Sequence, residues 1–292
     1  MGTTIDATAV TCGSRWGGRR GRKLADAAAI DCLARAGLEP DDVDLLLHTG
    51  LYHERNLGEP AVAALLQQDI GANPHDPHIG RHGTFSFDIA NGTCGVLTAF
   101  QIADRFLRAG TIRHALVIAG DANPSHHAAP GFPFGATGAA AVLSRDESTS
   151  GLVDFQWHTA PEDADLFRAI VSFESGHNLL RIHEAPEFAD RAAVWAAKVG
   201  ASLLADHGLT PDDIDLVVAA PVTAVFLDAV AINLGVPADR VVVPVLASRP
   251  HTAALLFALA DAQVSGRLTA ARRVLLLAAG AGITAGAALL IP

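Results

Sequence analysis

The chain repeats itself, and this repeat restricts the possible fold more than any other feature of the sequence. Three segments of the first half return in the second half in the same order, and each contains an apolar, strand-like run. The pairs are 37–47 with 208–218, 114–120 with 273–279, and 135–143 with 282–290. Three collinear pairs indicate two copies of one βαβ-type unit. Because strands alternate with helices, we expect an α/β protein with mixed, largely parallel sheets buried on both faces.

The two copies divide the chain into two similar halves, residues 1–150 and 151–292, which we expect to be related by a pseudo-twofold axis. One apolar segment, 274–291, is long enough to span a bilayer. Three glycines interrupt it, however, and no aromatic belt flanks it. We therefore predict two buried strands joined by a glycine turn, and no membrane span. Residues 155–183 show a less regular pattern.

Composition narrows the possible partners and compartments. The chain has a formal net charge of −10, which argues against a nucleic-acid binder. Cys12, Cys32 and Cys94 lie far apart and form no CxxC pair, which fits a reducing compartment and argues against a disulfide framework or a cysteine zinc site. The N-terminal residues lack the apolar core of a signal peptide. We expect a cytoplasmic protein with no metal site and no bound cofactor.

Residues 85–110 carry the strongest signal of chemistry. A strand-like run meets Thr93-Cys94-Gly95, and apolar residues then recur at helical spacing. The first N–H groups of a helix are unpaired and its dipole favours negative charge, so a cysteine there can be acidified to a thiolate. The same turn offers backbone donors to an oxyanion. For Cys94 taken alone, the alternative is a small residue of the core.

A glycine- and arginine-rich segment, 13–23, precedes the first expected helix. Its candidates for binding a phosphate or an acidic carrier protein are Arg19, Arg20 and Arg22. The alternative for this segment is a solvated loop.

The duplicated α/β pattern with a cysteine at a helix start resembles the thiolase superfamily, and within it ketoacyl-ACP synthase III. The likeness covers most of the chain and is most specific in residues 88–110, 134–143 and 280–289. The resemblance implies a layered α-β-α-β-α architecture and a cytoplasmic dimer that acts on acyl thioesters of CoA or acyl carrier protein. Members of that family form an acyl-cysteine and then condense or transfer the acyl group.

The chain departs from the family pattern at each of the three catalytic positions. The family's cysteine stands five residues after an aspartate, where this chain has Thr93, with Cys94 as its neighbour. The family's histidine follows a buried strand, where this chain has Ala220. The family's asparagine corresponds to His251, or to Arg249 if the alignment contains a gap. The N-terminal segment, where the family carries a substrate-lining loop, is also short.

These departures leave the nucleophile open. Cys94 could act with His251 as its base, because the repeat places His251 at the start of the matching second-half helix. Thr93 is the alternative nucleophile, or else its hydroxyl caps the helix. The remaining possibility is a site that has lost condensation chemistry.

Further residues are expected around the pocket. By resemblance, the turn Gly280-Ala281-Gly282 supplies a second oxyanion donor, since a backbone N–H survives exchange of glycine for alanine. The candidates for side chains that line the pocket are Asn91, His53 and Glu59. Their alternatives are a turn position for Asn91, a surface position for His53, and stabilisation of a helix dipole for Glu59.

Three functions compete at this point. The first is a non-standard acyltransferase or condensing enzyme of fatty-acid or polyketide-type secondary metabolism, which takes an acyl group from a carrier-protein or CoA thioester. The second is a catalytically silent partner subunit that forms a heterodimer with an active homologue. The third is a module that binds acyl groups or carrier protein without chemistry. We expect an enzyme, and a homodimer.

Overall fold

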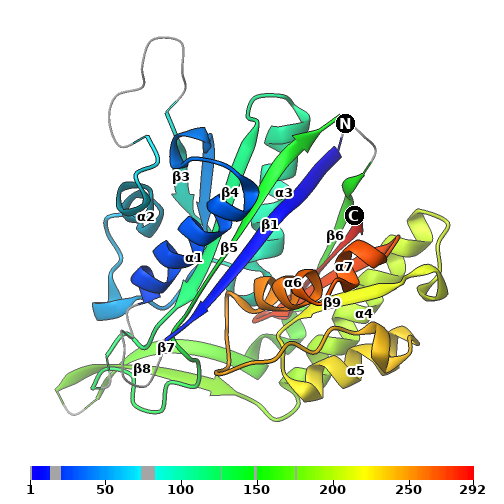
Figure 1. The fold of residues 1–292 in the computed structure, drawn as a ribbon. Coiled ribbons are helices and arrows are strands. Elements are labelled where there is room, and N and C mark those ends of the chain that lie inside the picture. The colour runs from blue at the N-terminus through cyan, green and yellow to red at the C-terminus, as the bar shows by residue number, and fades with distance from the viewer. Residues whose placement is uncertain (1, 14–20, 74–82, 126, 148–149, 175) are drawn as a thin grey trace.

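Each half of the chain builds one sheet (Figure 1). The computed structural model describes residues 2–13, 21–73, 83–125, 127–147, 150–174 and 176–292. The first sheet has the strand order β1-β5-β4-β2-β3. Its strands are β1 (Gly2–Cys12), β2 (Leu45–His48), β3 (Phe85–Asp88), β4 (His114–Asp121) and β5 (Thr137–Asp146).

The second sheet repeats the order of the first four strands as β6-β11-β10-β9. Its strands are β6 (Gly151–Thr159), β9 (Leu216–Ala220), β10 (Val274–Gly280) and β11 (Thr284–Ile291). The duplication is therefore confirmed, but the expected predominance of parallel pairs is wrong. Four of the seven strand pairs in these sheets are antiparallel. In the first sheet β5 pairs antiparallel with both β4 and β1, and in the second sheet β11 pairs antiparallel with both β10 and β6.

Helices complete the five layers that the family resemblance implies. Between the sheets lie α3 (Gly95–Arg108) and α6 (Ala254–Val264), whose side chains share one apolar core with both sheets. The first sheet is covered on its outer face by α1 (Gly21–Ala36) and α2 (Val62–Ile70). The second is covered by α4 (Phe188–Asp206) and α5 (Ala224–Leu234), and the short α7 (Arg267–Ala270) follows α6.

The repeated turns use the same polar contacts in both halves. Asp44 Oδ2 accepts hydrogen bonds from the backbone N–H groups of Arg113 and His114 at 2.7 and 3.1 Å. Asp215 Oδ2 accepts the equivalent bonds from Arg272 and Arg273 at 2.8 and 3.0 Å. Each aspartate thus ties the start of one buried strand to the start of its parallel neighbour, and this contact is present in both halves.

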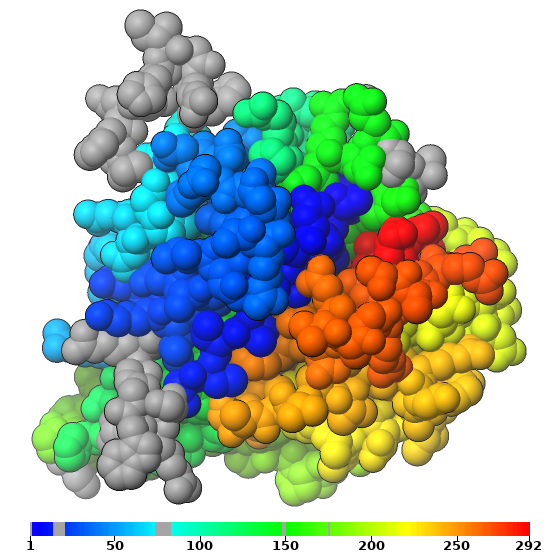
Figure 2. Space-filling view, in the orientation of Figure 1, coloured from blue at the N-terminus to red at the C-terminus, as the bar shows by residue number. Residues whose placement is uncertain are grey.

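The less regular segment 155–183 is ordered as strands, contrary to the sequence pattern. After β6, an antiparallel hairpin forms from β7 (Phe167–Glu174) and β8 (His177–Glu184). The hairpin extends beneath the first half of the molecule (Figure 1). From the same side, Figure 2 shows the early part of the chain (blue to cyan) mainly on the left and the last part (yellow to red) mainly at the lower right of the surface.

The apolar C-terminal segment forms two strands. Residues 274–280 and 284–291 are β10 and β11, as predicted, and pair antiparallel from Val274 with Leu290 to Gly280 with Thr284. Among the described residues, no helix is long and apolar enough to cross a membrane.

Candidate functional site

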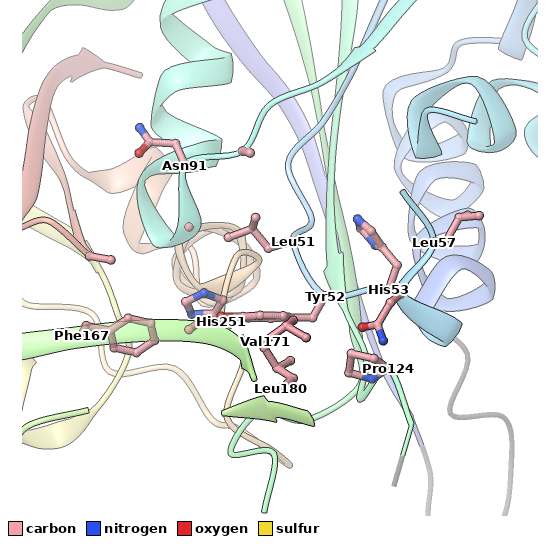
Figure 3. A pocket seen from close by; sticks show the side chains of 15 residues that line it. Leu51, Tyr52, His53, Leu57, Asn91, Pro124, Phe167, Val171, Leu180 and His251 are labelled. Carbon is pink, nitrogen blue, oxygen red and sulfur yellow. The ribbon is translucent and has the colours of Figure 1, made fainter. Parts of the chain in front are cut away.

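A cavity of about 530 Å³ lies between the two halves (Figure 3). The loop after β2, the turn before α3, the β7–β8 hairpin and the loop before α6 all contribute to its wall. A small recess of about 20 Å³ adjoins it and shares three of its residues, Phe167, His251 and Ala281. The turn before α3 and the loop before α6 therefore meet at one cavity.

Thr93 lies in the wall of the recess. It is in a short 3₁₀ turn, Gly92–Cys94, directly before α3, and its side chain is 5% exposed. The Thr93 hydroxyl donates a hydrogen bond to the backbone carbonyl of Ala279 in β10. A methyl group on Gly280 would lie 2.8 Å from Thr93 Oγ1, so the absence of a side chain at Gly280 allows this close approach. Thr93 therefore joins the helix start of the first half to a strand end of the second half, and it does not cap α3.

Cys94 points away from this wall. Its side chain is 0% exposed, lies in the core between the two sheets, and donates a hydrogen bond from Sγ to the carbonyl of Thr284 at 3.3 Å. Burial raises the pKa of the Cys94 thiol to about 12. Neither the cavity nor the recess includes it. In this conformation the thiol is neutral and out of reach of a substrate, which corresponds to the core position that was the alternative for this residue.

His251 occupies the wall opposite the turn that carries Thr93. Its ring is 7% exposed and stacks on Phe134, with ring centroids 4.2 Å apart. A methyl group on Gly92 would lie 3.9 Å from His251 Nε2, so this nitrogen faces the turn before α3. Burial lowers the pKa of His251, and the nearby Asp121 carboxylate partly opposes this effect. The imidazole is therefore neutral at pH 7 and able to accept a proton.

Comparison with known proteins identifies the family. The model for 3-oxoacyl-[acyl-carrier-protein (ACP)] synthase III matches residues 87–161, and the model for its C-terminal part matches residues 204–291. Beta-ketoacyl-[acyl-carrier-protein] synthase III of Sphingopyxis alaskensis is 31% identical over 274 residues, covering 90% of this chain and 81% of that protein. The chain belongs to the ketoacyl-ACP synthase III family. The protein of the same name from Aquifex aeolicus is 25% identical, and the match covers 91% of this chain and 82% of that protein.

Solved structures share the fold over the whole chain. The 3-oxoacyl-[acyl-carrier-protein] synthase III of Aquifex aeolicus superposes with a TM-score of 0.82 at 23% identity and covers 100% of both chains. The priming β-ketosynthase of the R1128 polyketide biosynthetic pathway gives 0.81 at 19% identity, covering 100% of this chain and 96% of the other. The thiolase fold expected from the resemblance is thus confirmed.

Two other positions compared with the family pattern carry no catalytic base. Ala220, where the family's histidine is expected, is fully buried in β9. Arg249, the alternative to His251, donates two hydrogen bonds to Glu184 at 2.8 and 2.9 Å, and its guanidinium lies over the Phe134 ring. Of the pair, His251 lines both the cavity and the recess, whereas Arg249 lines only the recess.

Asp121, at the end of β4, holds the cavity wall together, and the sequence patterns did not single it out as a site residue. Its fully buried carboxylate accepts bonds from the N–H groups of Leu51 and Tyr52 at 3.0 and 2.9 Å through Oδ1. Through Oδ2 it accepts bonds from the N–H and hydroxyl of Thr252 at 2.9 and 2.6 Å. The signal was a charged residue ending an otherwise apolar strand, but its partners are far away in sequence.

The three polar pocket candidates have different positions. Asn91 and His53 both line the cavity, and the Asn91 amide donates to Thr98 Oγ1 at 3.0 Å. Burial lowers the pKa of His53, and the neighbouring His48 lowers it further. Glu59 is exposed and lines none of the cavities described here, so its expected place in the pocket is wrong in this structure.

The glycine turn lies beside the site as expected. Ala281 lines both the cavity and the recess, and Gly280 lines the recess. Gly282 has a φ of +122°, a conformation that favours glycine, and it allows β10 to reverse into β11.

The arginine-rich segment is only partly described. Arg19 and Arg20 lie outside the described residues. Arg22 is not in a loop but in the first turn of α1, where it forms an ion pair with Asp69 at 3.0 Å. Among the described residues, no group of three or more His, Cys, Asp and Glu side chains could hold a metal ion.

Proposed function

We propose that this protein is a non-standard acyltransferase of the ketoacyl-ACP synthase III family. It takes an acyl group from a CoA or carrier-protein thioester and passes it directly to a small nucleophilic acceptor, with His251 as general base. The observation that carries this proposal is the recess wall formed by Thr93, His251 and Ala281, with the thiol of Cys94 turned into the core. The names of the relatives specify an acyl carrier protein, which supports a thioester donor. The similarity to a priming β-ketosynthase of a polyketide pathway supports a role in polyketide-type metabolism.

The reaction follows from the groups at the wall. His251 takes the proton from the acceptor, whose heteroatom attacks the thioester carbon and forms a tetrahedral oxyanion. Backbone N–H groups of the turn 280–282 stabilise that oxyanion. The C–S bond then breaks, the acyl group stays on the acceptor, and the leaving thiolate receives the proton held by His251. Neither an oxidant nor a metal is required.

Thr93 has a positioning role in this scheme. Its proton is directed at the carbonyl of Ala279, which is not a base, so the hydroxyl is poorly placed to become a nucleophile. The same bond fixes the strand end that leads into the turn 280–282. We expect Thr93→Ala to lower turnover by about tenfold through a misplaced oxyanion site, and Thr93→Ser to restore most of it.

The proposal is tested with hydroxylamine as a probe acceptor. The full chain is incubated with a series of acyl-CoA donors, and acyl hydroxamate is measured by mass spectrometry. Hydroxamate formation that Cys94→Ala retains and His251→Ala loses supports direct transfer. If Cys94→Ala abolishes turnover, the proposed function is wrong.

The silent-partner alternative is tested in the same experiment. If no donor gives hydroxamate above the buffer rate, the chain is not an acyltransferase by itself. Co-expression with an active homologue would then show whether a stable heterodimer forms.

We further propose that the protein is a homodimer that pairs through β3. This strand is at the edge of the five-stranded sheet, so one side of its backbone has no neighbouring strand among the described residues. Phe85 on this strand is 60% exposed, and its ring lies 5.2 Å from that of Phe87. A second copy would cover both rings. Analytical ultracentrifugation tests this: the native chain should sediment as a dimer, and Phe85→Glu should shift it to the monomer.

A further inference from the structure

A second cavity, of about 380 Å³, lies beside the first and is not used by the proposed reaction. Three residues, Tyr52, His53 and Leu57, line both cavities. His53 and Leu57 are on the side of the first cavity away from Phe167 (Figure 3). The second cavity is thus placed where the far end of a long ligand in the first cavity would arrive.

The two cavities differ in charge. Among the described residues that line the first cavity there is no Asp, Glu, Lys or Arg. In the described part of its wall, the second cavity has three cationic side chains, Arg22, Lys23 and Arg55, and one carboxylate, Glu54. Such a concentration of cations is unusual in a chain with 21 Lys and Arg residues and 31 Asp and Glu residues. The second cavity therefore favours an anion.

The cations are not fully neutralised by their neighbours. Arg22 pairs with Asp69, but within the described part of the chain neither Lys23 nor Arg55 forms an ion pair. Burial, followed by the charge of Asp69, raises the pKa of Asp26 to about 7, so this pair of acids carries less than its full negative charge near neutral pH.

The segment between the cavities adopts a costly backbone conformation. Arg55 and Asn56 have φ values of +61° and +52°, although neither is glycine. Residues other than glycine rarely adopt this left-handed conformation, and such strain concentrates at binding sites. Its effect here is to divide the side chains: Asn56 lines the first cavity, whereas Arg55 lines the second.

We propose that the second cavity is the distal end of the acyl site and binds a terminal carboxylate, so that the preferred donor is the thioester of a dicarboxylic acid. The proposal rests on the proposed function, because it assumes that the acyl group occupies the first cavity. The chain of the acyl group would pass Tyr52 and His53, and its carboxylate would meet Lys23 and Arg55. An alkyl chain of the same length would leave both cations without a partner.

The test compares thioesters that differ only at the far end. N-Acetylcysteamine thioesters of glutaric, pimelic and azelaic acids are paired with those of pentanoic, heptanoic and nonanoic acids. Binding to the full chain is measured by calorimetry at low and high salt. We expect at least one dicarboxylic thioester to bind about tenfold more tightly than its alkyl partner, with a preference that shrinks in high salt.

The variants separate a carboxylate site from a general effect of charge. Lys23→Gln/Arg55→Gln should abolish the preference while changing alkyl binding less than twofold. Arg272→Gln, on the second half with a side chain 86% exposed, is the control and should keep the preference. Equal binding of both thioester types, no binding of either type, or a preference that survives the double variant overturns the proposal.

A phosphate of CoA is the other possible anion for these side chains, and the choice of probe distinguishes it. N-Acetylcysteamine thioesters contain no phosphate, so a preference among them arises from the acyl carboxylate. If the double variant instead weakens heptanoyl-CoA and leaves the pimelic thioester unaffected, the cations bind the cofactor and the proposal is wrong.

Failure of this inference differs from failure of the proposed function. Hydroxamate formation without a dicarboxylic preference leaves the acyltransferase intact and removes the distal site. A dicarboxylic preference without hydroxamate formation would support the binding site and rule out the acyltransferase activity.

Discussion

The two helix starts that meet at the cavity use the same arrangement with different residues. Before α3, Thr93 faces the recess and Cys94 is buried against Thr284. Before α6, His251 faces the cavity and Thr252 is buried against Asp121. In each turn the first residue lines the cavity or its recess, and the side chain of the second is fully buried against the other half of the molecule.

This comparison explains why a thiol at the right helix start need not be a nucleophile. Successive residues of a helical turn point about 100° apart, so a shift of one position moves a side chain from the cavity to the core. The burial that makes Cys94 a good packing residue also raises its pKa to about 12. In the second turn the residue with an ionisable ring, His251, is the one that lines the cavity, and for that reason we assign the base to it.

The largest expected effect is at the cavity-facing position of the second turn. His251→Ala removes the only base that we assign to the reaction, and we expect hydroxamate formation to fall by about 10²–10⁴-fold. The measurement is the steady-state rate with one acyl-CoA donor. His177→Ala, an exposed histidine on β8, is the control and should keep the native rate. A loss of less than tenfold in His251→Ala would assign the base elsewhere.

The next effect tests the anchor of the second turn. Asp121→Ala leaves four buried donors without their acceptor, and we expect the free energy of unfolding to fall by roughly 3–5 kcal/mol. Denaturant titration measures this change. Asp121→Asn should lose less, because one amide oxygen still accepts, and Asp228→Ala on the exposed side of α5 should change little. An unchanged midpoint in Asp121→Ala would show that the turn does not depend on this carboxylate.

The pH dependence of the rate and of stability provides a further test of His251. Burial lowers the pKa of His251; the Asp121 carboxylate opposes this, Arg249 lowers it, and Glu184 again opposes it. The rate should therefore hold as pH falls to about 6.5 and decline only at the lower pKa of the folded state. Stability should begin to fall below about pH 6.5, where the unfolded chain binds a proton that folded His251 does not, and level off below the folded pKa. An acidic limb in the rate above pH 6.5 contradicts this.

The smallest effect is expected at the core-facing position of the first turn. Cys94→Ala removes one buried sulfur, and we expect a loss of about 1 kcal/mol in stability with a rate within threefold of the native value. Thermal unfolding and the hydroxamate assay measure the two quantities. Cys32→Ala, a buried cysteine of α1 remote from the cavity, provides a matched control.

Much of the architecture could be predicted because the sequence contains the same unit in two copies. Residues 37–47 and 208–218 carry the same turn and buried strand, and the aspartates Asp44 and Asp215 make the same contacts in both copies. The β7–β8 hairpin has no counterpart among the described residues of the first half. Several of its apolar side chains are exposed, so the period of two that marks a half-buried strand is obscured.

The site was predictable only in part. Thr93, His251 and Ala281 could be placed near one another because the repeat and the family resemblance both locate helix starts and strand ends. The direction of Cys94 depends on a rotation within one turn, and the role of Asp121 depends on partners about 70 and 131 positions away in sequence. Neither leaves a local pattern.

Intact-mass analysis after incubation with heptanoyl-CoA tests whether Cys94 carries an acyl group. It compares the native chain with Cys94→Ala, Thr93→Ala and Thr93→Cys. We predict no acyl adduct on the native chain, and a gain of one heptanoyl group on Thr93→Cys, whose new thiol faces the recess and His251. If the native chain gains an acyl group that only Thr93→Ala removes, the site is the one proposed here, but the reaction passes through an ester on Thr93 instead of direct transfer. A gain on the native chain that disappears in Cys94→Ala would contradict the account, because it would show that the buried thiol reaches the substrate.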